Sequence, residues 1–179
     1  RRIWQFRVRT CHIIRMLFIK IFIFTMIIGA SSAIGLMLAK KYTNRELELK
    51  EMKNALNMFE NKIKFTYEDI PAVFNDISQK IQGNIGRIFK TASNKMQNMS
   101  AGSAWEYSLE NTYTCLTKED VDIIKGLGRM LGKTDLNGQI SEINLVNNFI
   151  DTQIEEAKRE KDKNYKMYKT LGIVVGITI

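Results

Sequence analysis

Apolar residues form one long run near the start of the chain, a series of short helical repeats, and a second run at the end. Ile21 to Ala39 is nineteen residues without a charge. A helix rises about 1.5 Å per residue and bilayer hydrocarbon is about 30 Å thick, so this run can cross a membrane with its backbone groups bonded internally. The pattern predicts a transmembrane helix over residues 16–39.

Two other interpretations of this run are weaker. A cleaved secretory signal has an apolar region of about 7–15 residues that ends at small residues. Here the small residues Ala30 to Ala33 lie in the middle of a longer run, which Lys40 and Lys41 end as in a stop-transfer anchor. A buried core helix is a poorer fit still, because a chain of 179 residues seldom encloses nineteen consecutive apolar positions.

Residues 40–169 repeat their apolar positions at steps of three and four, the spacing of one helix face. The first of these helices continues directly from the membrane span. The predicted helices are 40–64, 71–81, 85–99, a short one from Ser103, one from Thr117 to Leu131, and a last one from Thr134 or Asp135. The apolar faces comprise Leu49, Met52, Leu56, Phe59, Ile63, Val73, Phe74, Ile77, Ile81, Ile85, Ile88, Phe89, Ala92, Met96, Val121, Ile124, Leu127, Leu131, Ile140, Ile143, Val146, Phe149, Ile150, Ile154 and Ala157.

Local signals support the helix starts. Pro71 suits a first helical turn. Two predicted capping boxes pair a hydroxyl with an acid three residues later, Ser103 with Glu106 and Thr117 with Asp120.

The chain ends on the apolar run Leu171 to Ile179 after a basic stretch, which predicts the start of a second membrane helix, cut short. A buried C-terminal strand is the alternative. The predicted fold is therefore all-α, a bundle of about five to six helices at 40–169 between an N-terminal transmembrane helix and a truncated C-terminal one at 170–179.

The net charge of +8 is concentrated beside the predicted membrane segments. Residues 1–20 hold six basic groups and no acid, Lys40, Lys41 and Arg45 add three more, and residues 158–169 hold six bases against two acids. Residues 46–157 are net acidic, which excludes a nucleic-acid face. Basic collars suit anionic lipid on the cytoplasmic side of a membrane. Cys11 and Cys115 imply no disulfide framework.

Residues 1–15 differ from the rest, with five arginines and the chain's single histidine, His12. They are either a basic leader that binds lipid headgroups or an untranslated upstream extension. We favour a start at Met16.

No catalytic constellation is found. Gly126 to Thr134 ends in the Gly-Lys-Thr of a phosphate-binding loop, but the residue five before Gly132 is Leu127 rather than glycine, and the preceding pattern is helical rather than a strand. We interpret it as a helix that ends on Gly132, with Gly128 allowing close helix approach. No cofactor, metal site or enzymatic activity is predicted.

Small residues lie four apart in both apolar runs. The pairs are Gly29 with Ala33, Ser31 with Gly35, and Gly172 with Gly176. Such faces let helix backbones approach closely in a membrane, so they are candidates for helix packing.

Several segments resemble a known family, stage III sporulation protein AB of endospore-forming bacteria. They are Ala55-Leu56, Phe59-Glu60 and Ile63; Ser103 to Glu106 with Ser108-Leu109; Leu127-Gly128, Leu131-Gly132, Asp135 and Gln139; and Lys163-Asn164, Lys166-Met167 and Leu171-Gly172. Leu127 replaces a common aromatic, and Tyr67 stands where the family often has proline. The residues before Met16 have no counterpart in the family.

The resemblance implies a helical domain similar to the cytoplasmic domains of the platform protein of type II secretion and type IV pilus machines. It also implies a non-enzymatic subunit of the channel complex between mother cell and forespore. Expected partners are a cytoplasmic secretion-type ATPase, other membrane subunits and lipid, with the domain facing the mother-cell cytoplasm. A candidate partner-binding turn comprises Arg129, Lys133, Asp135 and Gln139. The alternative is a membrane-anchored helical scaffold or signalling protein outside sporulation; an enzyme ranks third.

Overall fold

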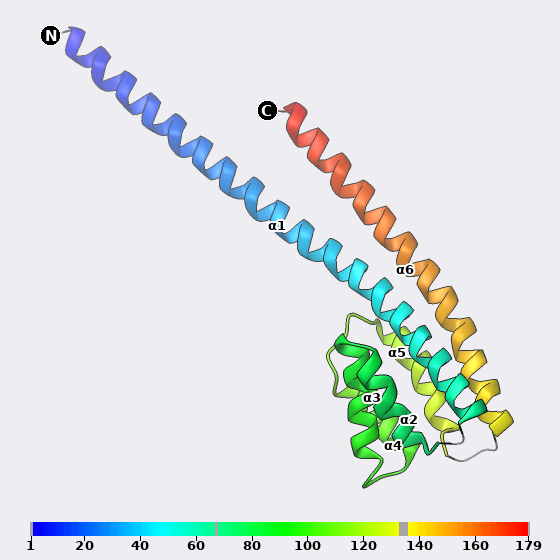
Figure 1. Cartoon of the computed structure of the whole chain (residues 1–179). Helices are drawn as coiled ribbons and strands as arrows, with labels where there is room; N and C mark the ends of the chain where they lie inside the picture. The colour runs from blue at the N-terminus through cyan, green and yellow to red at the C-terminus, as the bar shows by residue number, and fades with distance from the viewer. Residues whose placement is uncertain (1, 67, 133–135, 179) are drawn as a thin grey trace. The chain divides into compact units, whose positions relative to one another are not determined.

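The computed structural model describes the backbone of residues 2–66, 68–132 and 136–178. Within these, it describes the side chains of residues 16–27, 29, 40–66, 68–132, 136–164, 166 and 167. The elements are α1 (Arg2–Phe65), α2 (Ile70–Lys80), α3 (Gly83–Lys95), α4 (Ala101–Glu110), α5 (Lys118–Lys125), the 3-10 helix η1 (Gly126–Arg129) and α6 (Leu136–Thr178) (Figure 1). These elements confirm the all-α prediction, and the alternative of a C-terminal strand is wrong because α6 extends to Thr178.

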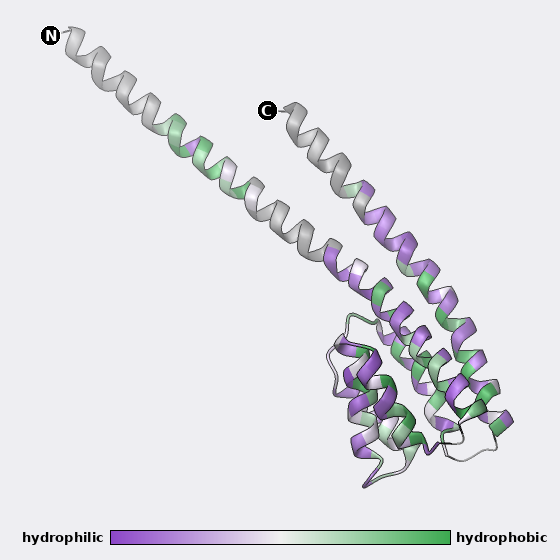
Figure 2. Cartoon of the chain, viewed as in Figure 1, coloured by the Kyte–Doolittle hydropathy of each residue, from purple (hydrophilic) through white to green (hydrophobic). Residues whose placement is uncertain are grey.

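The chain divides into two compact units, Arg1–Lys40 and Lys41–Ile179. In the first unit the large apolar side chains from Met16 to Ile27 are all exposed, from 49 % to 71 %. Figure 2 colours most of this stretch as hydrophobic. Among the described side chains, no helix combines the length and apolar character needed to cross a membrane. The predicted spans rest largely on residues 28, 30–39 and 170–179, whose side chains lie outside the described part.

The second unit is a bundle in which α2 to α5 pack against the last part of α1 and the first part of α6. Four aromatic rings fill its centre with edge-to-face contacts. Phe74 lies 5.1 Å from Phe59, 4.9 Å from Phe89 and 5.5 Å from Trp105, measured between ring centroids. All four side chains are fully buried. The predicted apolar faces therefore converge on one core.

The helix starts agree with one predicted capping box and correct the other. Thr117 and Asp120 form the full capping box of α5, as predicted. The box at Ser103 and Glu106 is wrong. Helix α4 begins at Ala101, and Ser100 is its N-cap, accepting a hydrogen bond from the Ser103 backbone N–H. The sequence does not distinguish the two positions, because Ser100 and Ser103 can each offer a capping oxygen.

The segment predicted as one helix from Thr117 to Leu131 ends earlier. Helix α5 stops at Lys125 and continues as η1. Gly132 has a φ of +72°, a left-handed conformation that glycine adopts without a steric penalty, in the turn that follows. Gly132 is thus a turn glycine beyond η1 rather than the C-cap of one continuous helix.

Gly102 and Gly128 bring α4 and η1 into direct backbone contact. A Cβ atom on Gly102 would lie 2.2 Å from the Gly128 carbonyl oxygen, and one on Gly128 would lie 3.2 Å from both Gly102 O and Trp105 Cδ1. The predicted close approach at Gly128 is confirmed, and its partner is α4.

Replacing Gly102 by alanine is expected to destabilise the chain by about 1–3 kcal/mol, because the clash is with backbone and outweighs a gain of about 1 kcal/mol in helix propensity. Gly126→Ala is the control, since its Cβ would meet only side-chain atoms, the nearest at 3.3 Å. Urea unfolding of the full chain in detergent measures both. Equal stability of the two variants would contradict the close contact.

Candidate functional site: a buried ion-pair network behind a surface groove

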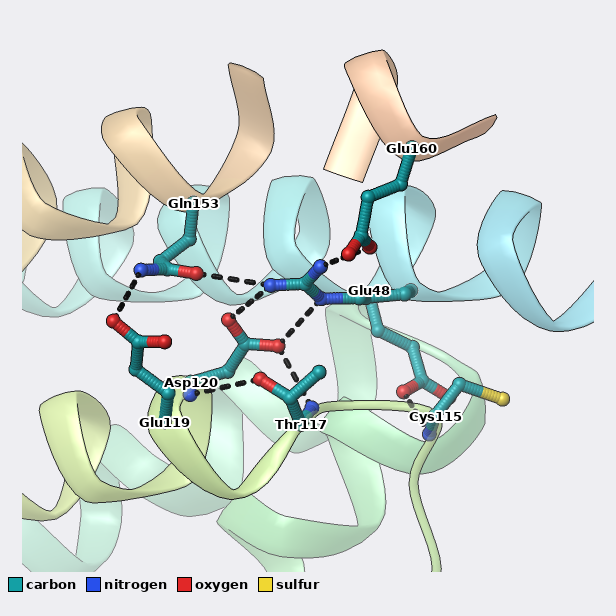
Figure 3. A network of polar contacts seen from close by, with 8 residues as sticks. Glu48, Cys115, Thr117, Glu119, Asp120, Gln153 and Glu160 are labelled. Carbon is teal, nitrogen blue, oxygen red and sulfur yellow. Dashed lines mark hydrogen bonds and ion pairs between the residues drawn. The ribbon is translucent and has the colours of Figure 1, made fainter. Parts of the chain in front are cut away.

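Arg45 lies at the centre of a polar network where α1 enters the second unit. Its side chain is 4 % exposed, although arginine is rarely buried. Its Nε donates to Asp120 Oδ2 at 2.8 Å and its Nη2 to Asp120 Oδ1 at 2.9 Å, a bidentate pair. Nη1 donates to Glu160 Oε2 at 2.6 Å and Nη2 to Gln153 Oε1 at 2.9 Å (Figure 3). One guanidinium therefore joins α1, α5 and α6.

Asp120 serves two structures at once. Its carboxylate accepts from the Thr117 backbone N–H at 2.8 Å, and its own N–H donates to Thr117 Oγ1 at 3.2 Å, so it completes the capping box of α5. The same carboxylate binds Arg45 and is 1 % exposed. The start of α5 is thus fixed to α1 through the residue that caps it.

Two further acids of α1 extend the network. Glu46 accepts from Lys50 and from Lys161 of α6, both at 2.6 Å. Glu48 accepts from Asn84 Nδ2 of α3 at 2.5 Å and from the Cys115 backbone N–H at 2.6 Å. Charge-assisted hydrogen bonds of this kind are stronger than neutral ones. Three neighbouring positions of α1 therefore contact α3, α5, α6 and the segment before α5.

Two of the basic residues that were predicted to face lipid instead belong to this network. Arg45 is buried against Asp120, and Lys161 is paired with Glu46, so neither is directed at lipid. Lys40 and Lys41, by contrast, are exposed. These pairs are not predictable from local sequence, because the partners lie 75 to 115 residues apart.

Two carboxylates of the network have lowered pKa values. Burial works to raise the pKa of Asp120, but hydrogen bonds from Arg45 and Thr117 and the charge of Arg45 outweigh it. Hydrogen bonds from Lys161 and Lys50 lower the pKa of Glu46. The hydrogen bond to Asp120 raises the pKa of Arg45. At neutral pH Arg45, Glu46 and Asp120 are therefore ionised.

These shifts predict acid sensitivity. Because the folded-state pKa values lie below the ordinary ones of about 4, the stabilisation is present above about pH 4 and is lost as the pH falls through the folded values. Stability of the full chain should therefore be nearly constant from about pH 7 to 5 and decline below about pH 4. Asp120→Asn should flatten that decline in urea unfolding. A variant with the same pH dependence as the parent would contradict the role of Asp120.

A surface groove of about 730 Å³ lies between α5, η1 and α6. Its lining residues are Lys118, Glu119, Asp122, Ile123, Gly126, Arg129, Glu142, Leu145, Val146 and Phe149. Leu145 is 48 % exposed and Phe149 50 % exposed, which is unusual for large apolar residues within a bundle. Phe149 belongs to the predicted apolar face of the last helix, yet half of it faces solvent. The groove therefore offers an apolar wall on α6 and a charged wall on α5.

One side chain links the groove to the network. Gln153 Nε2 donates to Glu119 Oε1 at 3.3 Å, while Gln153 Oε1 accepts from Arg45. Glu119 lines the groove, and Asp120 beside it faces the network (Figure 3). Two hydrogen bonds through Gln153 therefore connect Glu119 in the groove wall to Arg45.

The structure places the candidate partner-binding residues as follows. Arg129 is exposed and lines the groove. Gln139 lies on α6, one turn before the groove residue Glu142. Lys133 and Asp135 lie outside the described residues. Arg129 therefore lies in the groove, and Gln139 lies one turn from it. The sequence does not predict the groove, because the apolar periodicity at Phe149 is the same as that of a core residue.

The candidate membrane-packing residues are mostly untested. Gly29 is exposed, and a Cβ atom on it would meet nothing within 4 Å. The side chains of Ala33, Gly35, Gly172 and Gly176 lie outside the described residues, so packing there stays a prediction. Within the described residues, no group of three or more His, Cys, Asp or Glu is placed to hold a metal ion.

Fold and site together define a class of all-α protein in which buried ion pairs join two long terminal helices to a bundle of short ones. The chain belongs to the stage III sporulation protein AB family, whose family model matches residues 20–179. This match confirms the family resemblance predicted from the sequence.

Two known proteins are similar to this chain. It is 26 % identical over 157 residues to stage III sporulation protein AB of Bacillus subtilis (strain 168), covering 86 % of this chain and 92 % of that protein. A solved structure of a stage III sporulation protein AB matches with a TM-score of 0.62 at 22 % identity, covering 67 % of this chain and 98 % of the other. This second likeness supports the fold.

Proposed function

We propose that the protein is a non-enzymatic membrane platform subunit of the channel complex between mother cell and forespore that endospore formation requires. Family membership supports a role in sporulation. The domain would face the mother-cell cytoplasm, with both terminal helices directed to the membrane around the forespore. Its partners would be other subunits of the complex and a cytoplasmic secretion-type ATPase.

The observation that carries this proposal is the run of exposed apolar side chains from Met16 to Ile27 of α1, which only Lys20 and Thr25 interrupt. Phe18 is 69 % exposed, Phe22 71 % and Met26 69 %, and smaller values occur at the positions between them. A helical segment that is apolar over most of its surface requires an apolar environment. Exposed Lys40 and Lys41 lie beyond this segment on the same helix, and with a start at Met16 the one basic residue before the uncharged run is Lys20. By the positive-inside rule this difference supports a cytoplasmic domain.

The ion-pair network would supply the mechanical part of the function. Arg45 on α1 and Glu160 on α6 hold the two terminal helices together, Asp120 fixes α5 to α1, and Glu119 contacts Gln153 of α6. A partner that moves α5 would therefore move the helices that lead to the membrane. The protein would pass a conformational change rather than catalyse a reaction.

Partner binding at the predicted turn can be tested by charge reversal. Arg129→Glu in the full chain is expected to reduce co-purification with the secretion-type ATPase of sporulating cells. Arg87→Glu is the matched control, since Arg87 is also exposed but lies on α3. Unchanged co-purification of the Arg129 variant would contradict this part of the proposal.

A membrane-anchored scaffold outside sporulation is the second candidate. It is favoured by the direct contact of α1 and α6, where Asn147 Nδ2 donates to Asn57 Oδ1 at 2.9 Å. A helix pair of this kind could relay a signal. Deletion of the gene separates the two candidates, because a strain that sporulates normally without it would favour the scaffold.

A further inference from the structure

The groove between α5, η1 and α6 has the geometry of a helix-binding site. On α6 its residues Glu142, Leu145, Val146 and Phe149 are spaced three, four and seven apart, which places them along one face. Gln153 contacts Glu119 near the start of α5, and Glu142 lies beside Gly126 at its end. The two helices therefore run antiparallel along the walls of the groove.

Among the described residues, none covers the apolar part of the groove fully, since Leu145 and Phe149 are each about half exposed. Ile123 and Val146 also line it. Exposed apolar patches bordered by polar residues are typical of interaction sites. An amphipathic helix with apolar residues at the same three-four-seven spacing would fill such a groove.

The charges around the groove define the polar face of this ligand. Glu119 lies beside Gln153 near the start of α5, Asp122 follows about one turn later, and the α6 face continues by helical spacing to the exposed Glu156. Lys118 is the one basic lining residue from α5, and Arg129 lies at the opposite end on η1. Asp122 is exposed and forms no salt bridge or hydrogen bond with another described residue, although its charge acts on Lys125. Together with Glu119 and Glu142 it gives the groove lining three carboxylates against the two cations Lys118 and Arg129, which favours a basic side chain on the ligand.

We infer that this groove binds an amphipathic α-helix of another protein, with aliphatic or aromatic anchors against Leu145 and Phe149 and a lysine or arginine beside Asp122. The inference rests on the proposed function in that the helix belongs to another subunit of the complex. It deepens that function by naming the partner's binding element.

Photo-crosslinking in sporulating cells tests the ligand directly. The full chain carries p-benzoylphenylalanine in place of Phe149, and crosslinked peptides are identified by mass spectrometry. The expected product is a peptide of another protein with apolar residues three, four and seven apart and a flanking lysine or arginine. The control probe replaces Gln97, an exposed residue outside the groove, and should not yield that peptide.

Charge reversal adds a second readout. Asp122→Lys should lower the yield of the crosslink at position 149 about tenfold, because like charges would then oppose each other. Glu155→Lys is the control on α6: its side chain is 78 % exposed and lies away from the groove face, so the yield should not change. Thermal unfolding confirms that both variants are folded.

Four outcomes would overturn the inference: crosslinks only to a second copy of this chain, only to lipid, only to peptides without the apolar spacing, or an unchanged yield in the folded Asp122 variant. Failure of the proposed function is distinguishable. A deletion strain that sporulates normally would contradict that function, while the crosslinked peptide would still report what occupies the groove.

Discussion

Replacing Arg45 by methionine is expected to destabilise the folded chain by about 3–5 kcal/mol, the range found when one member of a buried ion pair is removed. The substitution leaves the Asp120 carboxylate ionised and 1 % exposed without its bidentate partner. The loss of Arg45 costs less at Glu160, because that side chain is 43 % exposed and can be solvated by water. Urea unfolding of the full chain in detergent, followed by helical circular dichroism, measures the change.

An exposed ion pair provides the control for Arg45. Lys53 contacts Asp151 at 2.5 Å, with side chains 34 % and 52 % exposed, so Lys53→Met should cost about 0–1 kcal/mol. Adding Asp120→Asn to Arg45→Met should recover part of the loss, because the uncompensated charge is then removed. A cost for Arg45→Met no larger than that for Lys53→Met would show that the network does not hold the helices together.

Replacing Trp105 by alanine should cost about 3–5 kcal/mol, the usual loss for a fully buried aromatic residue. Its ring contacts Phe74 and Phe89, at centroid distances of 5.5 and 5.2 Å. Its Nε1–H also donates to the Ile124 carbonyl at 2.9 Å, which would lose its partner. Trp105 thus joins α4 to the end of α5, next to the groove.

Two further substitutions separate the parts played by the Trp105 ring. Trp105→Phe keeps an aromatic ring but removes the hydrogen bond, and should cost less than alanine. Tyr113→Ala is the surface control: Tyr113 is 81 % exposed, and a change within about 0.5 kcal/mol is expected. Thermal unfolding in detergent compares them. Equal losses for Trp105→Ala and Tyr113→Ala would contradict the placement of Trp105 in the core.

The fold was predictable because local signals and apolar periodicity agree. The steps of three and four that include Leu49, Phe74 and Ile88 placed all three residues in the observed core. The capping box of Thr117 and Asp120 depends only on residues close together in the sequence, and its prediction is confirmed. At Ser103 the same rule failed, because Ser100 competes for the cap and the sequence does not rank the two serines.

The site was less predictable because its contacts are distant in sequence. Arg45 and Asp120 are 75 residues apart, so the sequence offered only a basic residue near a predicted membrane span. Phe149 matched the helical period of core residues, yet the groove leaves it half exposed. Periodicity identifies an apolar face but does not show whether another helix of the same chain covers it. Arg129 was selected from the turn, and the structure adds the groove beside it.

Cysteine accessibility in sporulating cells is the most direct test of the proposed membrane platform. The full chain carries Cys11→Ser and Cys115→Ser, and a single reporter, Gln97→Cys, at an exposed position of the helical bundle. We expect the protein to stay in the membrane fraction after alkaline washing. We also expect a membrane-impermeant maleimide to label the reporter only after the cells are permeabilised. Labelling in intact cells, or recovery of the protein in the soluble fraction, would contradict it.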